Sequence, residues 1–291
     1  MKIAFTGASG YIGKTFKRVY QKLDLVSLSY DLQKGEYFSL NDVTTPSIEQ
    51  FLDPIEVLIH LGSFMPKNIQ EAQDKVSSKK NMESTIKLLT YRLPSLKHII
   101  YISTIDVYDF TFKVSEKTKP NPKTEYAISK FACENIVKQF AEERGILFSI
   151  LRVGTVYGPG EDSFQKVIPT MLKEFILKNQ ITIYDNGSVR RNFLYVDDVA
   201  KMIGEVVFAS RKNKLINLIG LHSTSIRELA DIIQLLKPEH KASIKEINSI
   251  APSSDHDFDT TFLNSNFPNF KFMSITDGLN NELNFIQNSL S

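Results

Sequence analysis

A glycine-rich segment near the start of the chain constrains the fold more than any other part of the sequence. Residues 6–13 read TGASGYIG and follow the apolar run Ile3-Ala4-Phe5, which predicts a buried strand, a glycine turn and the start of a helix. Gly7 permits a sharp turn, Gly10 leaves room for a pyrophosphate, and Gly13 lets the helix pack closely against the strand. Because unpaired N–H groups and the helix dipole favour an anion at a helix N-terminus, the segment predicts a dinucleotide site.

An acidic residue stands where such a site needs one. A helix is expected over 11–22 and a second strand over 25–28, and Asp31 follows that strand. A carboxylate at this place accepts hydrogen bonds from the ribose hydroxyls of a dinucleotide and repels a 2′-phosphate. The two residues before Asp31 are not arginine, so the sequence favours NAD, with NADP as the alternative cofactor.

Strands and helices alternate along the first half of the chain. Strands are expected at 55–60, 98–102 and 146–151, with helices at 68–91 and 125–143. This alternation predicts an α/β fold with a Rossmann-like, doubly wound parallel sheet. Glycine and proline cluster just after Arg152, where a smaller C-terminal substrate-binding region is expected to begin. The expected division is 1–152 plus 191–220 for the dinucleotide-binding domain, and 153–190 plus 221–291 for the substrate-binding region.

Composition excludes several classes of function. The net charge of +2 is too small to suggest binding to nucleic acid or to a membrane surface. No apolar stretch is long enough to span a membrane, and no signal peptide is recognisable. The single cysteine, Cys133, rules out an internal disulfide and suits a reducing cytoplasm. No metal site is expected.

A tyrosine and a lysine form the clearest candidate for chemistry. Tyr126 and Lys130 lie four residues apart in the expected helix 125–143, so both project from the same face. A nearby ammonium is expected to lower the pKa of the phenol toward working pH, which makes it a general acid or base for interconverting an alcohol and a carbonyl. Thr104 ends the preceding strand at the edge where a cofactor crevice forms, and its hydroxyl can bind the same substrate oxygen.

With these pieces assembled, the chain resembles an extended short-chain dehydrogenase/reductase of the NAD-dependent epimerase/dehydratase family, which acts largely on nucleotide sugars. The matching motifs cover most of the chain. They are TGASGYIG at 6–13, Asp31, Asp42-Val43, IHLGS at 59–63, Asn81, Ser103-Thr104, Tyr126-x-x-x-Lys130, RVGTVYGPG at 152–160 and RRNFLYVDDVA at 190–200.

The resemblance implies a set of site residues. Thr104, Tyr126 and Lys130 are the implied catalytic triad. The cofactor-binding residues are Gly7, Gly10, Tyr11, Ile12, Gly13, Asp31, Asp42, Val43, Leu61, Gly62, Asn81, Tyr126 and Lys130. The substrate-binding residues are Thr104, Asp106, Thr155 and Arg191. Asp42 is equally well explained as part of a turn. Hydride exchange between nicotinamide and a sugar carbon, usually C4, is implied.

Three departures from the family pattern bear on the substrate and the reaction. Thr155 stands where many members have an asparagine that helps to hold the substrate diphosphate, and Ala251 stands where a second phosphate-binding arginine is usual. Ile105 replaces one member of the carboxylate pair that 4,6-dehydratases use. Elimination needs both a proton donor and an acceptor, so we expect a 4-epimerase or a 4-ketoreductase. Asp106 either acts as a single base or bonds backbone in a turn.

Two rival functions remain open at this stage. The missing second arginine also suits a reductase of a non-sugar carbonyl, although Arg191 argues against it. A dinucleotide-sensing regulator without catalysis is the other rival, but the chain retains both Tyr126 and Lys130. The resemblance further implies a homodimer formed through the two long helices, 68–91 and 125–143.

Overall fold

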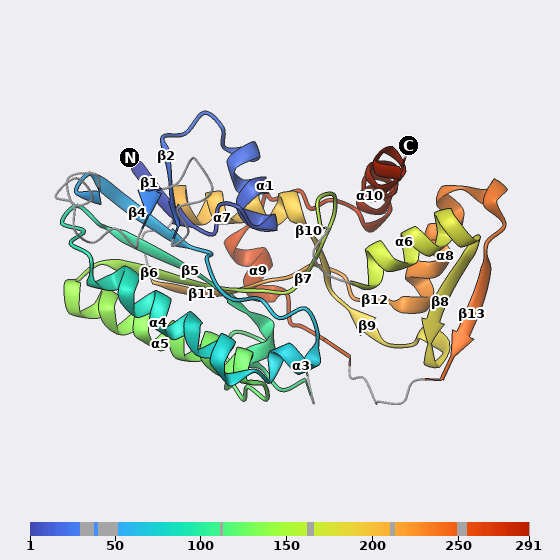
Figure 1. The fold of residues 1–291 in the computed structure, drawn as a ribbon, viewed down its shortest axis with the longest axis horizontal. Coiled ribbons are helices and arrows are strands. Elements are labelled where there is room, and N and C mark those ends of the chain that lie inside the picture. The colour runs from blue at the N-terminus through green and yellow to red at the C-terminus, as the bar shows by residue number, and fades with distance from the viewer. Residues whose placement is uncertain are drawn as a thin grey trace. The chain divides into compact units, whose positions relative to one another are not determined.

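The computed structural model describes residues 1–29, 38–39, 52–110, 113–161, 166–209, 213–248 and 255–290. The chain forms two compact units (Figure 1). Unit 1 contains residues 1–109, 119–153 and 200–217, and unit 2 contains residues 110–118, 154–199 and 218–291. The domain boundaries expected from the sequence stay a prediction. Within the described residues no helix is long and apolar enough to cross a membrane.

Unit 1 is built on a seven-stranded sheet. Its order is β3(Phe38–Ser39), β2(Leu25–Ser29), β1(Lys2–Thr6), β4(Ile55–His60), β5(His98–Thr104), β6(Leu147–Val153) and β11(Lys214–Leu218). The pairings from β3 through β6 are all parallel. Strand order 3-2-1-4-5-6 is that of dinucleotide-binding folds. The predicted doubly wound parallel sheet is therefore confirmed.

Helices cover both faces of this sheet. Helices α4(Lys75–Thr90) and α5(Glu125–Arg144) lie on one face, and α1(Tyr11–Val19) and α7(Val196–Ala209) lie on the other (Figure 1). Every residue of β5 is buried, as expected for a strand covered on both sides. The carboxyl ends of the strands lead into the glycine turn after β1, the loop after β4, and the short helix η1(Ile105–Val107) after β5.

The prediction of one long helix over 68–91 is wrong. It consists of α3(Ile69–Ala72) and α4, separated by Gln73 and Asp74. The Asn68 side chain accepts from the N–H of Glu71 and caps α3, whereas Asp74 accepts from Val76 and caps α4. Asx side chains compete for backbone N–H groups, and here they start two helices where the apolar pattern suggests one.

The described residues of unit 2 form three two-stranded sheets that pack with helices. β7(Thr155–Tyr157) pairs with β10(Phe193–Tyr195), β9(Arg190–Arg191) with β12(Thr224–Ser225), and β8(Gln180–Tyr184) with β13(Ser243–Ile247). Its core includes Phe175, Ile181, Leu229 and Leu283. The remaining elements are α6(Val167–Lys178), η2(Asp185–Gly187), α8(Ile226–Leu236), η3(Pro238–His240), α9(Thr261–Asn266) and α10(Ile275–Leu290).

Candidate active site

The glycine turn joins β1 to α1 in unit 1. Gly7 has a φ of +73°, in the left-handed region that residues with a Cβ rarely adopt. A Cβ on Gly7 would lie 2.7 Å from the backbone nitrogen of Gly62, and one on Gly13 would lie 2.2 Å from the carbonyl oxygen of Gly7. The turn, α1 and the loop after β4 can therefore pack this closely only with glycine at these two positions.

The helix N-terminus at this turn fits a dinucleotide phosphate. Gly10 is the N-cap of α1, Tyr11 and Ile12 begin the helix, and its first turn carries no acidic residue. Among the described residues, a Cβ on Gly10 would meet only the Gly7 carbonyl oxygen, at 3.2 Å. The space before Gly10 and the positive end of the helix dipole thus suit an anion. The predicted cofactor residues Asp31, Asp42 and Val43 lie outside the described residues.

A buried hydrogen-bond chain holds the loop after β4 against the turn. The N–H of Gly62, which follows Leu61 at the end of β4, donates to Thr6 Oγ1 at 2.8 Å. Thr6 Oγ1 lies 2.7 Å from His60 Nδ1, and His60 Nε2 lies 2.9 Å from Thr85 Oγ1. Because Thr85 donates its hydrogen to the carbonyl oxygen of Asn81, His60 Nε2 is the donor and Nδ1 the acceptor. Burial and the Lys130 charge lower the pKa of His60 to about 3, so the ring is neutral.

The three predicted catalytic residues all belong to unit 1. Tyr126 lies in the first turn of α5, which Thr124 caps, and Lys130 lies one turn later. Lys130 Nζ donates to the carbonyl oxygen of Ile102 at 2.7 Å and to Ser63 Oγ at 3.3 Å. Thr104 ends β5, and its Oγ1 accepts from the N–H of Asp106 at 3.2 Å. The Tyr126 and Lys130 side chains are buried to 2% exposure, so both work away from bulk water.

The electrostatics of the tyrosine differ from the expectation. Burial raises the pKa of Tyr126 and the Asp106 carboxylate raises it further, while a hydrogen bond with Thr104 acts in the opposite direction. The expected lowering by Lys130 is therefore not found, because the cost of burying a phenolate dominates. Burial lowers the pKa of Lys130 to about 8, and Cys133 and Glu134 oppose this shift.

Residues 63–65 of the loop after β4 contact α5. Ser63 accepts from Lys130, and the Phe64 ring packs edge-on against Tyr126 with 6.5 Å between ring centroids. The Tyr126 hydroxyl donates to Met65 Sδ at 3.4 Å. The loop is fixed by Asn81, whose Oδ1 accepts from the N–H of Phe64 at 2.6 Å and whose Nδ2 donates to Ser129 Oγ at 3.1 Å. Asn81, predicted to bind cofactor, thus positions this loop; its cofactor role stays a prediction.

Sequence reasoning missed a buried ion pair beside the predicted catalytic residues. Arg152 at the end of β6 donates from Nε and Nη2 to the two carboxylate oxygens of Glu134, at 2.9 and 2.6 Å. Ser103 Oγ donates to the same carboxylate at 2.5 Å. This pair ties β5, β6 and α5 together next to Thr104 and Lys130. Glu134 follows Lys130 by one helical turn on the same face, a spacing that could have flagged it.

The other predicted substrate-binding residues are less buried than Tyr126 and Lys130. Asp106 lies in η1 and is exposed, and Thr155 begins β7 in unit 2, where it is half-buried. Arg191 in β9 is half-buried, and its Nη1 donates to the carbonyl oxygen of Arg190 at 2.8 Å. Burial lowers the pKa of Arg191 and Asp255 opposes the shift.

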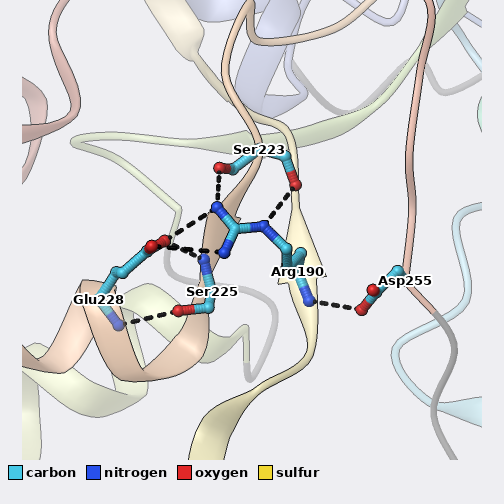
Figure 2. Close-up of polar contacts among 5 residues, drawn as sticks. All are labelled: Arg190, Ser223, Ser225, Glu228 and Asp255. Atoms are coloured by element: carbon cyan, nitrogen blue, oxygen red, sulfur yellow. Dashed lines mark hydrogen bonds and ion pairs between the residues drawn. The ribbon is translucent and has the colours of Figure 1, made fainter.

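Arg190, the residue before the predicted phosphate-binding arginine, is engaged within unit 2. Its guanidinium donates to the carbonyl oxygen of Ser223 and to both carboxylate oxygens of Glu228, and its N–H donates to Asp255 (Figure 2). Glu228 also forms a capping box with Ser225 at the start of α8. Arg190 thus organises the start of α8, and the two adjacent arginines differ in what surrounds them.

The arrangement in unit 1 suits a proton transfer coupled to cofactor chemistry. A buried phenol, a threonine hydroxyl that acts to lower its pKa and a lysine cation lie at the carboxyl edge of the sheet, which is where such folds bind their ligands. The phenol can donate a proton to an oxygen or accept one from it. Within the described residues no group of His, Cys, Asp and Glu is arranged to hold a metal ion.

Comparisons with known proteins show what this chain is similar to. A profile of the NAD dependent epimerase/dehydratase family matches residues 3–218. A putative UDP-glucose 4-epimerase of Methanocaldococcus jannaschii is 27% identical over 250 residues, covering 80% of this chain and 81% of that protein. A dTDP-D-glucose 4,6-dehydratase of Dictyostelium discoideum is 26% identical, covering 76% of this chain and 58% of that protein.

A solved structure shows the same fold. The UDP-glucuronic acid 4-epimerase of Bacillus cereus, crystallised with UDP-glucuronic acid and NAD, superimposes with a TM-score of 0.81 at 22% identity, covering 99% of this chain and all of that one.

Proposed function

Because the chain belongs to the NAD-dependent epimerase/dehydratase family, we propose that it acts on a nucleotide sugar and exchanges a hydride between NAD and sugar carbon 4. Membership makes it an enzyme of the extended short-chain dehydrogenase/reductase type, and NAD, the predicted cofactor, is that of the family. Relatives include both a 4-epimerase and a 4,6-dehydratase by name, so the choice of reaction rests on the residues of this chain.

One observation carries the proposal. The buried Tyr126 hydroxyl interacts with Thr104, and Lys130 is anchored one helical turn away on Ile102 and Ser63. Tyr126 acts as general acid and base on the sugar oxygen, and Thr104 bonds the same oxygen. Lys130 supplies the positive charge that favours the phenolate when the site is filled and orients the nicotinamide ribose. NAD bound at this site would supply the hydride exchange with sugar carbon 4.

The residue after Thr104 favours simple redox chemistry over elimination. Ile105 is apolar and 4% exposed, so it offers neither a proton donor nor an acceptor. Asp106 is the single carboxylate of this segment, and elimination of water needs a partner for it. We therefore propose a 4-epimerase or a 4-ketoreductase and not a 4,6-dehydratase.

The binding residues that we propose are those that the sequence predicts. The glycine turn with Gly7, Gly10 and Gly13 holds the pyrophosphate of NAD, and Asp31 selects NAD over NADP. Arg191 binds a substrate phosphate, since a guanidinium matches phosphate geometry, and Thr155 lines the same subsite. Residues 1–152 plus 191–220 carry the cofactor, and the remainder carries the substrate.

We further propose a homodimer in the cytoplasm. Helices α4 and α5 pack against each other and expose Val76, Ile86 and Ile128, which are 71%, 50% and 45% exposed. Pairing of two copies through these helices would remove that apolar area from water.

The single cysteine suits a reducing compartment.

The first experiment is to denature the purified protein and identify any nucleotide released. Near-stoichiometric NAD supports an epimerase that recycles its own hydride, whereas an empty protein that turns over with added NADH supports a ketoreductase. Preference for NADPH would contradict the role of Asp31.

Turnover is then measured on UDP- and dTDP-sugars. Tyr126→Phe should lower kcat by about 10²- to 10⁴-fold while NAD binding persists, and the exposed Tyr184→Phe is the matched control. Equal activity of Tyr126→Phe and the parent would overturn the assignment.

A further inference from the structure

The methionine whose sulfur contacts the hydroxyl of the catalytic tyrosine belongs to a residue that is half exposed to solvent. The Tyr126 hydroxyl donates to Met65 Sδ at 3.4 Å. Tyr126 itself is 2% exposed, whereas Met65 is 51% exposed. A small solute can therefore reach the Met65 residue, although Tyr126 behind it is buried.

The two residues before Met65 are held by neighbouring contacts. Phe64, the residue before it, is held at its backbone by Asn81 at 2.6 Å, and its ring packs edge-on against Tyr126. Ser63 is bonded to Lys130. The loop therefore presents Met65 to the tyrosine from a fixed backbone.

The other sulfur atoms lack this combination of exposure and contact. The chain has six methionines and one cysteine. Met171 and Met202 are buried, Met82 and Met273 are half-buried, and Met1 is exposed at the terminus, while Cys133 is buried. Met65 thus combines accessibility with contact to a catalytic group.

We propose that Met65 is a site of reversible oxidation by peroxide, and that its sulfoxide inhibits the enzyme by capturing the Tyr126 hydroxyl. A lone pair of the thioether sulfur attacks the O–O bond of hydrogen peroxide. One oxygen is transferred to the sulfur, the other leaves as water, and the sulfur is oxidised as the peroxide is reduced. A methionine sulfoxide reductase reverses the change.

The chemistry of the product explains the inhibition. A thioether is a weak hydrogen-bond acceptor, so the substrate oxygen displaces it readily from the phenol. A sulfoxide oxygen is a strong, polar acceptor on the same side chain. The Tyr126 proton is then engaged by Met65 and is no longer available to the reacting oxygen. This inhibition rests on the proposed role of Tyr126 as the general acid and base.

The first test measures modification without any assay of turnover. The purified enzyme is treated with dilute hydrogen peroxide, and each methionine peptide is followed by mass spectrometry. Met65 should gain one oxygen faster than Met82 and Met273. A hydrogen bond from the phenol engages a lone pair of the Met65 sulfur. Met65 should therefore be oxidised faster in the Tyr126→Phe variant than in the parent. Oxidation of Met82 or Met273 ahead of Met65, or an unchanged rate in Tyr126→Phe, would overturn the contact.

The second test measures the consequence for activity, with each variant compared with its own untreated rate. Peroxide should lower the parent's rate by about tenfold or more, since general acid–base catalysis contributes at least this much. The reductase should restore it. Met65→Leu should keep its rate, and Cys133→Ala should be inactivated like the parent. Full oxidation of Met65 without loss of rate, or equal inactivation of Met65→Leu, would contradict the proposal.

The two tests separate this proposal from the proposed function. If untreated enzyme turns over no nucleotide sugar, the proposed function fails, and the peptide data still decide whether Met65 is the oxidised residue in contact with Tyr126.

Discussion

Two arginine–glutamate pairs of the same chemistry occupy opposite environments. In unit 1, Arg152 Nη2 lies 2.6 Å from Glu134 Oε2, and the two side chains are 2% and 6% exposed. In unit 2, Arg190 Nη2 lies 3.1 Å from Glu228 Oε2, and the two side chains are 39% and 52% exposed. Both carboxylates accept two bonds from one guanidinium.

The difference teaches what each pair can contribute. A buried pair gives up the hydration of both ions, so loss of one partner leaves a charge without water or counter-ion. The ions of an exposed pair are hydrated in both the folded and the unfolded chain, so the pair contributes little to the free energy of unfolding. We therefore expect Arg152–Glu134 to fix the register of β5, β6 and α5 beside the catalytic residues. Arg190–Glu228 adds only modestly to the start of α8.

The largest expected effect comes from breaking the buried pair. Arg152→Met should lower the free energy of unfolding by about 3–5 kcal/mol, because Glu134 remains buried without its partner. Urea denaturation followed by circular dichroism measures the change. Removing both charges, with Glu134→Leu added to Arg152→Met, should recover much of the loss. A fall of less than about 1 kcal/mol in the single variant would mean that burial does not distinguish the pairs.

The buried histidine of unit 1 should make stability depend on pH. The pKa of His60 is lowered to about 3 in the folded chain, against about 6.5 when unfolded. The unfolded chain therefore binds the proton first, and this contribution to stability is complete above pH 6.5 and is lost as pH falls toward 3. It amounts to about 2 kcal/mol between pH 7 and pH 5.

Urea denaturation at these two pH values measures the effect, and His60→Gln should reduce the difference by that amount. His222→Gln, a change at an exposed residue of unit 2, is the matched control. An equal pH dependence in His60→Gln and the parent would show that His60 titrates normally.

A smaller effect is expected at the capping box of unit 2. The Ser225 side chain accepts from the N–H of Glu228, which caps α8. Ser225→Ala should cost about 1 kcal/mol of unfolding free energy. Ser223→Ala, which removes only a 3.3 Å contact with Arg190 Nε, should cost less. If the two variants cost the same, the cap is not what stabilises this helix.

The smallest expected effect is loss of the exposed pair itself. Glu228→Gln, which removes the charge of the pair and keeps the Arg190 bonds to Ser223, should lower the unfolding free energy by no more than about 1 kcal/mol, and the difference should shrink in 1 M salt because screening weakens exposed charges. Thermal unfolding in low and high salt measures both. A cost as large as that of Arg152→Met would remove the distinction between the two pairs.

Local patterns in the sequence carried much of the fold and part of the site. The glycine turn, the strands of the parallel sheet and the Ser225 capping box depend on residues close together in the chain, so spacing predicts them. The Tyr126–Lys130 pair depends on one turn of one helix. The expected helix 68–91 failed because Asp74 offers its carboxylate to the N–H of Val76, a local competition that apolar periodicity does not register.

What only the tertiary structure decided is the set of contacts between distant residues. Arg152 meets Glu134 across 18 residues of sequence, Thr6 meets His60 across 54, and Tyr126 meets Met65 across 61. The direction of the Tyr126 pKa shift also depends on burial, which only the folded chain defines. Spacing fixes which side chains share a turn or a helical face, because the backbone geometry is regular. Contacts between elements depend on how those elements pack, and packing is a property of the whole core.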